Sequence, residues 1–321
     1  MRLLRQADIE QALPMPQAIR LMGLAFAAIS NRSVQTAERQ VLETAAGHAL
    51  LMGASGRGRG VIAKLVTVIP PNSSRGLPVS SGLALLVDDG DGTPRAMLDA
   101  TALTAWRTAA ATGFATDLLA RRGVRCGLLV GSGTQARAQL LAMDAARNLD
   151  EIGLYARERK RVLQLIAAVQ PEIKARLIAV DDCATAVRAA GIITTATTST
   201  TPVIDGGQVG PGCHVNGIGS FRPGMCELDS ALVAKSRVFV ESRATAVAEA
   251  GELIAACREG ISKQSQWTEI GEVTGGGATG RCNEEELTFY KSVGHAVFDL
   301  FAAAAVYEVS EKLGLGQQWD P

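Results

Sequence analysis

Between residues 126 and 242, short apolar segments alternate with segments of helical periodicity, and this alternation restricts the fold more than any other feature of the chain. The apolar segments are CGLLV, EIGLYAR, RLIAV, GIITTATT, CHVNGIG and SRVFVES. Strands that alternate with helices pair in parallel, because each helix carries the chain back to the edge where the previous strand began. The sequence therefore predicts an α/β domain with a parallel sheet of Rossmann type.

The first hundred residues follow a different pattern. A helical period is present at 15–29, ahead of several apolar stretches of strand type. These stretches lie at 41–52, 61–69 and 82–86. Glycine-rich reversals at 53–60 and 88–95 predict that they form an antiparallel sheet. A last apolar helix is predicted at 289–308, and a chain of 321 residues is long enough for two domains.

Charge and cysteine usage exclude several classes of partner. The chain has 32 basic and 32 acidic residues without a run of like charge, so we expect neither nucleic-acid nor membrane binding. Its six cysteines form no C-x-x-C pair, which predicts reduced thiols and a cytoplasmic protein. None of its three histidines lies at ligand spacing from another, so we expect no metal site.

The segment CGLLVGSGTQARAQLL, residues 126–141, has the form of a strand, a glycine turn and a helix. Gly131, Gly133 and Ala136 take the three small positions of G-x-G-x-x-G/A, which permit a tight turn and a close approach to a pyrophosphate at a helix N-terminus. We predict a dinucleotide site over a plain chain reversal. Its turn residues are Gly131, Ser132, Gly133, Thr134, Gln135 and Ala136.

The end of the next strand indicates which dinucleotide fits. Enzymes that bind NAD place an acidic residue there against the ribose hydroxyls, but here Ala156 is followed by Arg157, with Arg161 one turn on. Guanidinium groups favour a 2′-phosphate, so NADPH is the expected cofactor, with NADH possible. The alternative is that both arginines belong to a solvated helix face.

Three cations in the first domain, Arg39, Lys64 and Arg107, suggest a site for an anion. Lys64 interrupts the apolar strand VIAKLVTVI, and Arg107 lies within an alanine-rich helix. A charge in such surroundings is costly unless a group of opposite charge meets it, although each residue alone is also compatible with an exposed side chain. Together they predict a carboxylate clamp.

Four motifs, TAWRTAAATGFATDLLA, GSGTQA, HVNGIGSFRPGMCELD and KSVG, follow one another along the chain. In these motifs and their spacing the chain resembles the ornithine cyclodeaminase and mu-crystallin family over essentially its full length. The resemblance implies a homodimer. It also implies an α+β substrate-binding and dimerisation domain, 1–117 with 294–321, and a Rossmann domain, 118–293. In the family, the positions of Arg39, Lys64 and Arg107 contact the substrate carboxylate.

One departure within the family separates its chemistries. Cyclodeaminases and archaeal-type alanine dehydrogenases have an aspartate after the N-x-x-G turn, where this chain has Phe221, and a phenyl ring cannot move protons. The resemblance therefore favours the ketimine-reducing branch, which also lacks this aspartate. The hypothesis is NAD(P)H-dependent reduction of Δ1-pyrroline-2-carboxylate or Δ1-piperideine-2-carboxylate to L-proline or L-pipecolate, with Lys64 sharing the carboxylate or relaying a proton. Alternatives are ornithine cyclisation, alanine dehydrogenation and a non-catalytic NADPH-binding protein.

The sequence also predicts roles for several other polar residues. Ser80 and Ser81 are expected to line the substrate ring pocket. Thr195 and Thr197 are expected along the cofactor, unless they serve only the strand's β-propensity. Two acidic residues of the ELD stretch, Glu227 and Asp229, are expected to cap a helix or to lie at the domain interface. The glycine-rich segment 275–280 is expected to be a mobile connection rather than a second phosphate loop.

Overall fold

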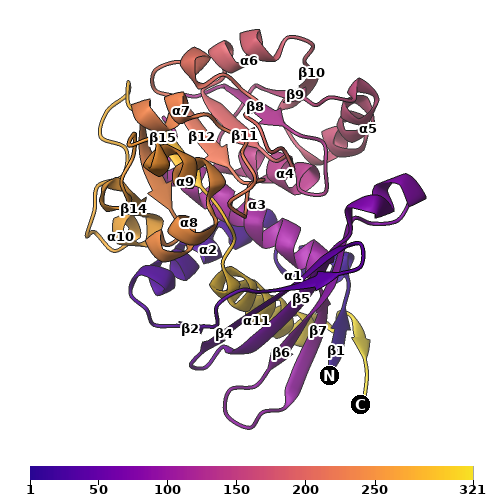
Figure 1. The fold of residues 1–321 in the computed structure, drawn as a ribbon. Helices are drawn as coiled ribbons and strands as arrows, with labels where there is room; N and C mark the ends of the chain where they lie inside the picture. Colours follow the sequence, from indigo (N-terminus) through magenta and orange to yellow (C-terminus); the bar gives the residue numbers. More distant parts are fainter. Residues whose placement is uncertain (321) are drawn as a thin grey trace. The chain divides into compact units, whose positions relative to one another are not determined.

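A computed structural model describes residues 1–320 and divides the chain into two compact units, each drawn in Figure 1. Unit 1 comprises Met1–Thr108 and the chain from His295 onward, and unit 2 comprises Ala109–Gly294. The first boundary falls inside one long helix, α3 (Ala100–Leu119). The boundary predicted after residue 117 lies near the end of that helix, because a continuous helix carries no sequence signal for a change of unit.

Unit 1 is an eight-stranded sheet with helices packed on one face (Figure 1). Its strands run in the order β16-β1-β7-β6-β5-β4-β2, with β3 also paired to β4, and all pairs but β1–β7 are antiparallel. The strands are β1 (Arg2–Leu4), β2 (Gln35–Thr36), β3 (Gln40–Thr44), β4 (Gly47–Gly56), β5 (Gly60–Val68), β6 (Ser80–Val87), β7 (Pro94–Asp99) and β16 (Gln317–Gln318). The helices are α1 (Gln6–Ala12), α2 (Met15–Ser30), the start of α3 and α11 (Ala296–Leu313), with a 3-10 turn η1 (Pro70–Arg75).

The alternation of side chains along β5 decides which face of this sheet is covered. Ile62, Lys64 and Val66 are buried on the side of α11, whereas Val61 and Leu65 on the other side are exposed. The same even-numbered face continues through the register partners of β5 in β4 and β6. Lys64 is therefore carried into the interior of unit 1 by the period of its strand.

Two predicted elements of unit 1 are wrong in detail. The stretch predicted as one strand at 41–52 is a hairpin, because the chain turns at Ala45 and Ala46 between β3 and β4. The helix predicted at 289–308 begins only at Ala296, and strand β15 (Leu287–Lys291) precedes it. Apolar character alone does not separate a buried strand from a buried helix, and Gly294, with φ at 82°, divides the two.

Unit 2 confirms the predicted α/β class with a Rossmann-type parallel sheet (Figure 1). Its strand order is β10-β9-β8-β11-β12-β15-β13-β14, and every pair is parallel. Besides β15, the strands are β8 (Cys126–Val130), β9 (Glu151–Tyr155), β10 (Arg176–Ala179), β11 (Ile192–Thr195), β12 (His214–Gly217), β13 (Ser236–Val240) and β14 (Thr268–Glu269).

Helices cover both faces of this sheet, because successive residues of each buried strand point to opposite sides. Leu129 packs in one apolar cluster with α4 and α5, and its neighbour Leu128 packs in another with α6, α7 and α9. The helices are α4 (Ala136–Ala146), α5 (Arg159–Val169), α6 (Cys183–Ala189), α7 (Ser230–Lys235), α8 (Arg243–Glu249), α9 (Gly251–Arg258) and α10 (Ile270–Thr274). Short 3-10 turns are η2 (Gln170–Glu172), η3 (Gly206–Gln208) and η4 (Gln264–Gln266).

A buried polar network fastens the second half of α3 to this sheet. The His214 ring hydrogen-bonds to Thr288 at 2.9 Å and to Asn216 at 3.0 Å, and Asn216 donates to Thr116 of α3 at 3.0 Å. Burial lowers the pKa of His214 to about 3, so its ring is neutral at physiological pH. These histidine and threonine side chains therefore serve packing.

The part of the chain that the structure describes contains no single helix long and apolar enough to cross a membrane. Helices α1 and α2 meet that test only together, and the chain bends by 79° between them. Within residues 1–320 no group of three or more His, Cys, Asp or Glu side chains is placed to hold a metal ion.

Candidate active site

Two of the three predicted cations meet inside unit 1 on a carboxylate. Lys64 Nζ of β5 lies 2.7 Å from Asp299 Oδ2 of α11, and Arg107 Nε of α3 lies 2.9 Å from Asp299 Oδ1. Lys64 Nζ also donates to Thr104 Oγ1 at 3.2 Å. We call Lys64, Arg107 and Asp299 the cation cluster; all three side chains are at most 4% exposed.

The electrostatics of the cation cluster favour an added anion. Burial lowers the pKa of Lys64 to about 8, although Asp299 opposes the shift, and Arg107 and Arg39 lower it further. Burial alone would raise the pKa of Asp299, but Arg107 and Lys64 hold it below its usual value. Arg107 Nη1 is buried and has no hydrogen-bond partner among the described residues. A carboxylate could accept from this atom and offset the excess positive charge.

The remaining predicted substrate residues lie around the cluster at different distances. Arg39, half-buried between β2 and β3, acts on the charge of Lys64. Ser80 shares the even-numbered face of β6 with Ala84, the register partner of Lys64, but its own partner is Val68 at the far end of β5. Ser81 alternates to the exposed face. Arg39 thus lies near enough to influence the charge of Lys64, whereas Ser81 lies on the other side of the sheet.

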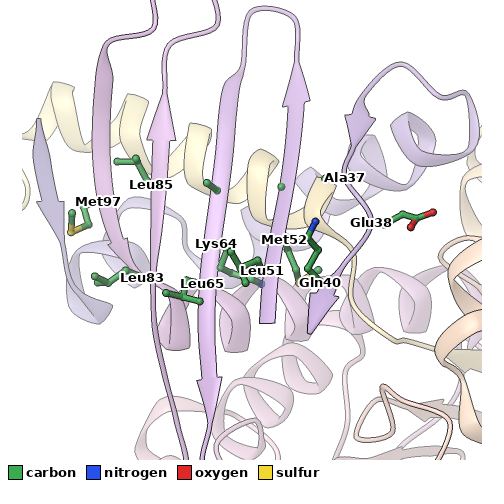
Figure 2. Close-up of a pocket in the computed structure, with 12 residues that line it drawn as sticks. Ala37, Glu38, Gln40, Leu51, Met52, Lys64, Leu65, Leu83, Leu85 and Met97 are labelled. Carbon is green, nitrogen blue, oxygen red and sulfur yellow. The ribbon is translucent and has the colours of Figure 1, made fainter. Parts of the chain in front are cut away.

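A separate hollow of about 400 Å³ lies against the exposed face of the same sheet. Figure 2 shows Leu65, Leu83 and Leu85 across β5 and β6, with α11 behind the strands. Lys64 borders the hollow, but its amine is bonded to Asp299 on the side of α11. The hollow is mostly apolar and is therefore not where we place an anion.

The predicted glycine turn lies at the carboxyl end of β8 in unit 2. Gly131 has φ at 128°, and a Cβ there would lie 2.4 Å from the Ala196 carbonyl oxygen, so only glycine fits. A Cβ on Gly133 would meet no atom within 4 Å, and α4 begins at Ala136. Open space above a glycine at a helix N-terminus is what a pyrophosphate requires. The turn therefore fits a dinucleotide.

Other predicted cofactor residues surround this turn. Strand order reverses between β8 and β11, the usual place for a nucleotide in an open parallel sheet. Thr195 ends β11 with a buried Oγ1 that lacks a partner among the described residues, as does Gln135 Oε1 in the turn. Thr197 Cγ2 would lie 3.4 Å from a Cβ on Gly131. Ser132 is half-buried and Thr134 is exposed.

The two arginines after β9 have different surroundings. Gly131 N–H donates to the Tyr155 carbonyl at 2.8 Å, which brings the end of β9 beside the glycine turn. Arg157 is exposed and forms no ion pair or hydrogen bond within residues 1–320. Arg161 pairs with Glu158 at 3.0 Å. Arg157 is thus the better placed of the two for a phosphate.

Sequence reasoning missed the central role of Asp299. The signal was present, because Asp299 is the one acidic residue in the apolar stretch AVFDLFAAAAV.

The predicted capping role of Asp229 is confirmed, since Asp229 accepts from Leu232 N–H at 2.8 Å at the start of α7. Glu227 caps no helix but binds two loops. The connection 275–280 follows α10, and Arg237 donates to the carbonyls of Thr279 and Gly280.

Known proteins of similar sequence and structure show the family of the chain. A relative from Bacillus cereus, Delta(1)-pyrroline-2-carboxylate reductase, is 37% identical over 257 residues, which are 79% of each chain. The solved structure of Thermococcus litoralis Delta(1)-pyrroline-2-carboxylate reductase, in complex with NADH and L-proline, has a TM-score of 0.95 and 31% identity, and the match covers 99% of this chain and 100% of that one. An archaeal alanine dehydrogenase dimer with bound NAD has a TM-score of 0.91 and 30% identity, with coverage of 100% and 99%. The profile of the ornithine cyclodeaminase/mu-crystallin family matches residues 1–313, and the chain belongs to this family.

Proposed function

We propose that the protein is an NAD(P)H-dependent reductase of cyclic ketimines, which converts Δ1-pyrroline-2-carboxylate or Δ1-piperideine-2-carboxylate to L-proline or L-pipecolate. The cation cluster carries this proposal, because its buried Arg107 Nη1 lacks a partner among the described residues. A substrate carboxylate supplies the missing acceptor. The relatives named as pyrroline-carboxylate reductases support the choice of substrate.

The residues have distinct tasks in this reaction. Arg107 and Arg39 bind the carboxylate and orient the ring, and the turn at Gly131–Ala136 with Thr195 and Thr197 holds the dinucleotide. The bound cofactor supplies a hydride to the carbon beside the carboxylate. The amine product also needs a proton on nitrogen, and Lys64, with a pKa of about 8, holds one at neutral pH. Ser80, which shares the even-numbered face of β6, lines the ring pocket in this proposal, and Ser81 does not.

For the cofactor we propose NADPH over NADH. Arg157 carries this choice, because it lies after β9, beside the glycine turn, and follows Ala156 where enzymes that bind NAD usually have an acidic residue. The solved relatives hold NADH or NAD, so a nicotinamide cofactor is common to both possibilities.

The Arg157→Ala variant tests this choice, with Arg161→Ala as its matched control. We expect Arg157→Ala to raise the Michaelis constant for NADPH by about tenfold, the loss of one charge-assisted hydrogen bond. The constant for NADH should change little, and Arg161→Ala should have the smaller effect because Glu158 engages that side chain. Equal effects of Arg157→Ala on both cofactors would refute the phosphate contact.

We also propose a homodimer formed through the exposed face of the unit 1 sheet. Val61, Leu65 and Leu83 are 37%, 46% and 56% exposed there, on neighbouring strands. A contiguous apolar face of this kind indicates a protein interface, and one solved relative is described as a dimer. A second copy of the chain is the partner whose matching face would cover it.

The test of function is oxidation of NADPH by the purified protein with chemically prepared Δ1-pyrroline-2-carboxylate and Δ1-piperideine-2-carboxylate. We expect turnover with at least one of them. In a separate assay with NAD⁺ or NADP⁺, we expect no ammonia to be released from ornithine or alanine. Turnover with ornithine or alanine alone would replace the proposal with deaminase or dehydrogenase chemistry. NADPH binding without turnover of any substrate would indicate a non-catalytic binding protein.

A further inference from the structure

A buried carboxylate, Glu227, joins the two loops that follow β11 and β12. Its side chain is 0% exposed. Glu227 Oε1 accepts from Thr197 N–H and Glu227 Oε2 accepts from Gly219 N–H, both at 2.6 Å. Thr197 and Gly219 lie beyond the ends of β11 and β12. The two hydrogen bonds to Glu227 therefore connect the chain segments where the pairing of the two strands has ended.

Backbone contacts hold the same loops tightly. Cys226 N–H donates to the Ser199 carbonyl at 3.0 Å, and Val203 N–H donates to the Glu227 carbonyl at 2.8 Å. A Cβ on Gly219 would lie 2.0 Å from the Thr197 carbonyl oxygen. Such packing leaves little space between the two loops, and the Glu227 carboxylate accepts a hydrogen bond from each of them.

A second layer of buried charge supports Glu227. Its backbone N–H donates to Glu252 Oε1 at 2.9 Å, and Glu252 Oε2 lies 3.2 Å from Lys291 Nζ. Burial raises the pKa of Glu227, while the nearby Lys291 ammonium opposes the shift. Because both Glu227 oxygens accept from N–H groups, the geometry fits the ionised carboxylate; a protonated oxygen would direct O–H at an N–H donor.

The placement of these loops gives Glu227 a functional consequence. A dinucleotide lies across the point where strand order reverses, with one nucleotide on each half of the sheet. The turn after β8 and the end of β9 serve the adenosine half. The loops after β11 and β12 lie at the carboxyl ends of the other half. We infer that Glu227 is a positioning residue for the nicotinamide half of the cofactor site, an inference that rests on the proposed function.

The Glu227→Gln variant tests this inference by fluorescence titration. Glutamine keeps the size but has one acceptor oxygen, so the N–H of Thr197 or Gly219 loses its partner. The ligands are whichever of NADPH and NADH the wild type binds more tightly, and the matching adenosine fragment, 2′,5′-ADP or 5′-ADP. We expect the dissociation constant of the dinucleotide to rise by about tenfold and that of the fragment to stay unchanged.

The matched control is Asp229→Asn, two residues along, which keeps an oxygen to cap α7, removes the acceptor of Gly206 N–H and leaves both loops tied to Glu227. It should change neither dissociation constant. Equal weakening of dinucleotide and fragment in Glu227→Gln would reveal a general structural role and overturn the inference, as would no weakening at all.

A measurement on the wild type covers the case in which Glu227→Gln does not fold. Amide hydrogen exchange of peptides spanning 197–203 and 217–221 should slow when the dinucleotide binds and remain unchanged with the adenosine fragment. Unchanged exchange in both peptides with bound dinucleotide would overturn the inference and leave the proposed function intact. A wild type that binds neither NADPH nor NADH would overturn both.

Discussion

Asp299 pairs with two buried cations and raises the pKa of one of them, Lys64. Its two oxygens bind Lys64 and Arg107 separately, and without it two buried cations would face each other unpaired. The two cations were predictable because each interrupts an apolar or alanine-rich segment. Their partner is 192 or more residues away in the chain, and no spacing rule connects residues so far apart.

We expect Asp299→Asn to shift the pH dependence of kcat/KM for the ketimine. The carboxylate raises the pKa of Lys64, so its loss lowers that pKa below about 8, and the protonated amine disappears at a lower pH than in the wild type. The alkaline limb of the profile should therefore move to lower pH. Thr104→Val, which removes only an uncharged partner of Lys64, should move it much less.

Unpairing a buried ion pair costs about 3–5 kcal/mol, so the profile is recorded at a temperature where circular dichroism shows Asp299→Asn to be folded. An unchanged alkaline limb would show that the effect of Asp299 on the pKa of Lys64 does not control the reaction. It would also exclude the lysine from the proton transfer.

At the scale of elements, the strand, turn and helix around the glycine motif followed directly from sequence. The motif fixes a local geometry through Gly131, and the parallel order of the neighbouring strands follows from the alternation with helices. The β3–β4 hairpin and the start of α11 were not predictable from apolar pattern, because both depend on how the chain reverses at Ala45–Ala46 and at Gly294. The contacts of Glu227 could not be predicted from the sequence either, because its partners are backbone groups of loops.

The two glycines of the turn should respond differently to alanine. Gly133→Ala should leave the melting temperature close to the wild-type value, because no protein atom lies near the added methyl group, but should weaken dinucleotide binding by about tenfold or more. Gly131→Ala should destabilise the fold, because its positive φ and the Ala196 carbonyl exclude a side chain. Thermal unfolding and cofactor titration measure both effects. Normal cofactor affinity in Gly133→Ala would mean that no phosphate lies over this glycine.

At the scale of the whole molecule, the two-unit division and the fold class could be predicted, and the family resemblance agrees with both. The exposed apolar face of the unit 1 sheet was not predicted from the sequence. The structure shows it through exposed leucines that alternate with buried residues on β5 and β6. A chain that keeps such a face in water needs a partner surface.

Leu83→Glu should therefore convert the dimer to a monomer of 33.5 kDa by light scattering. The charge would be buried without a partner in the dimer interface. Leu163→Glu, at a leucine of α5 that is 49% exposed, is the control and should leave the mass unchanged. A wild type that is already monomeric would contradict the proposed interface.

The most direct test of the central claim is a crystal structure of the protein with NADP⁺ and L-proline. We expect the proline carboxylate to lie within about 3 Å of Arg107 Nη1, with Lys64 beside it. A carboxylate bound elsewhere, with Arg107 and Lys64 still in contact with Asp299 alone, would contradict it.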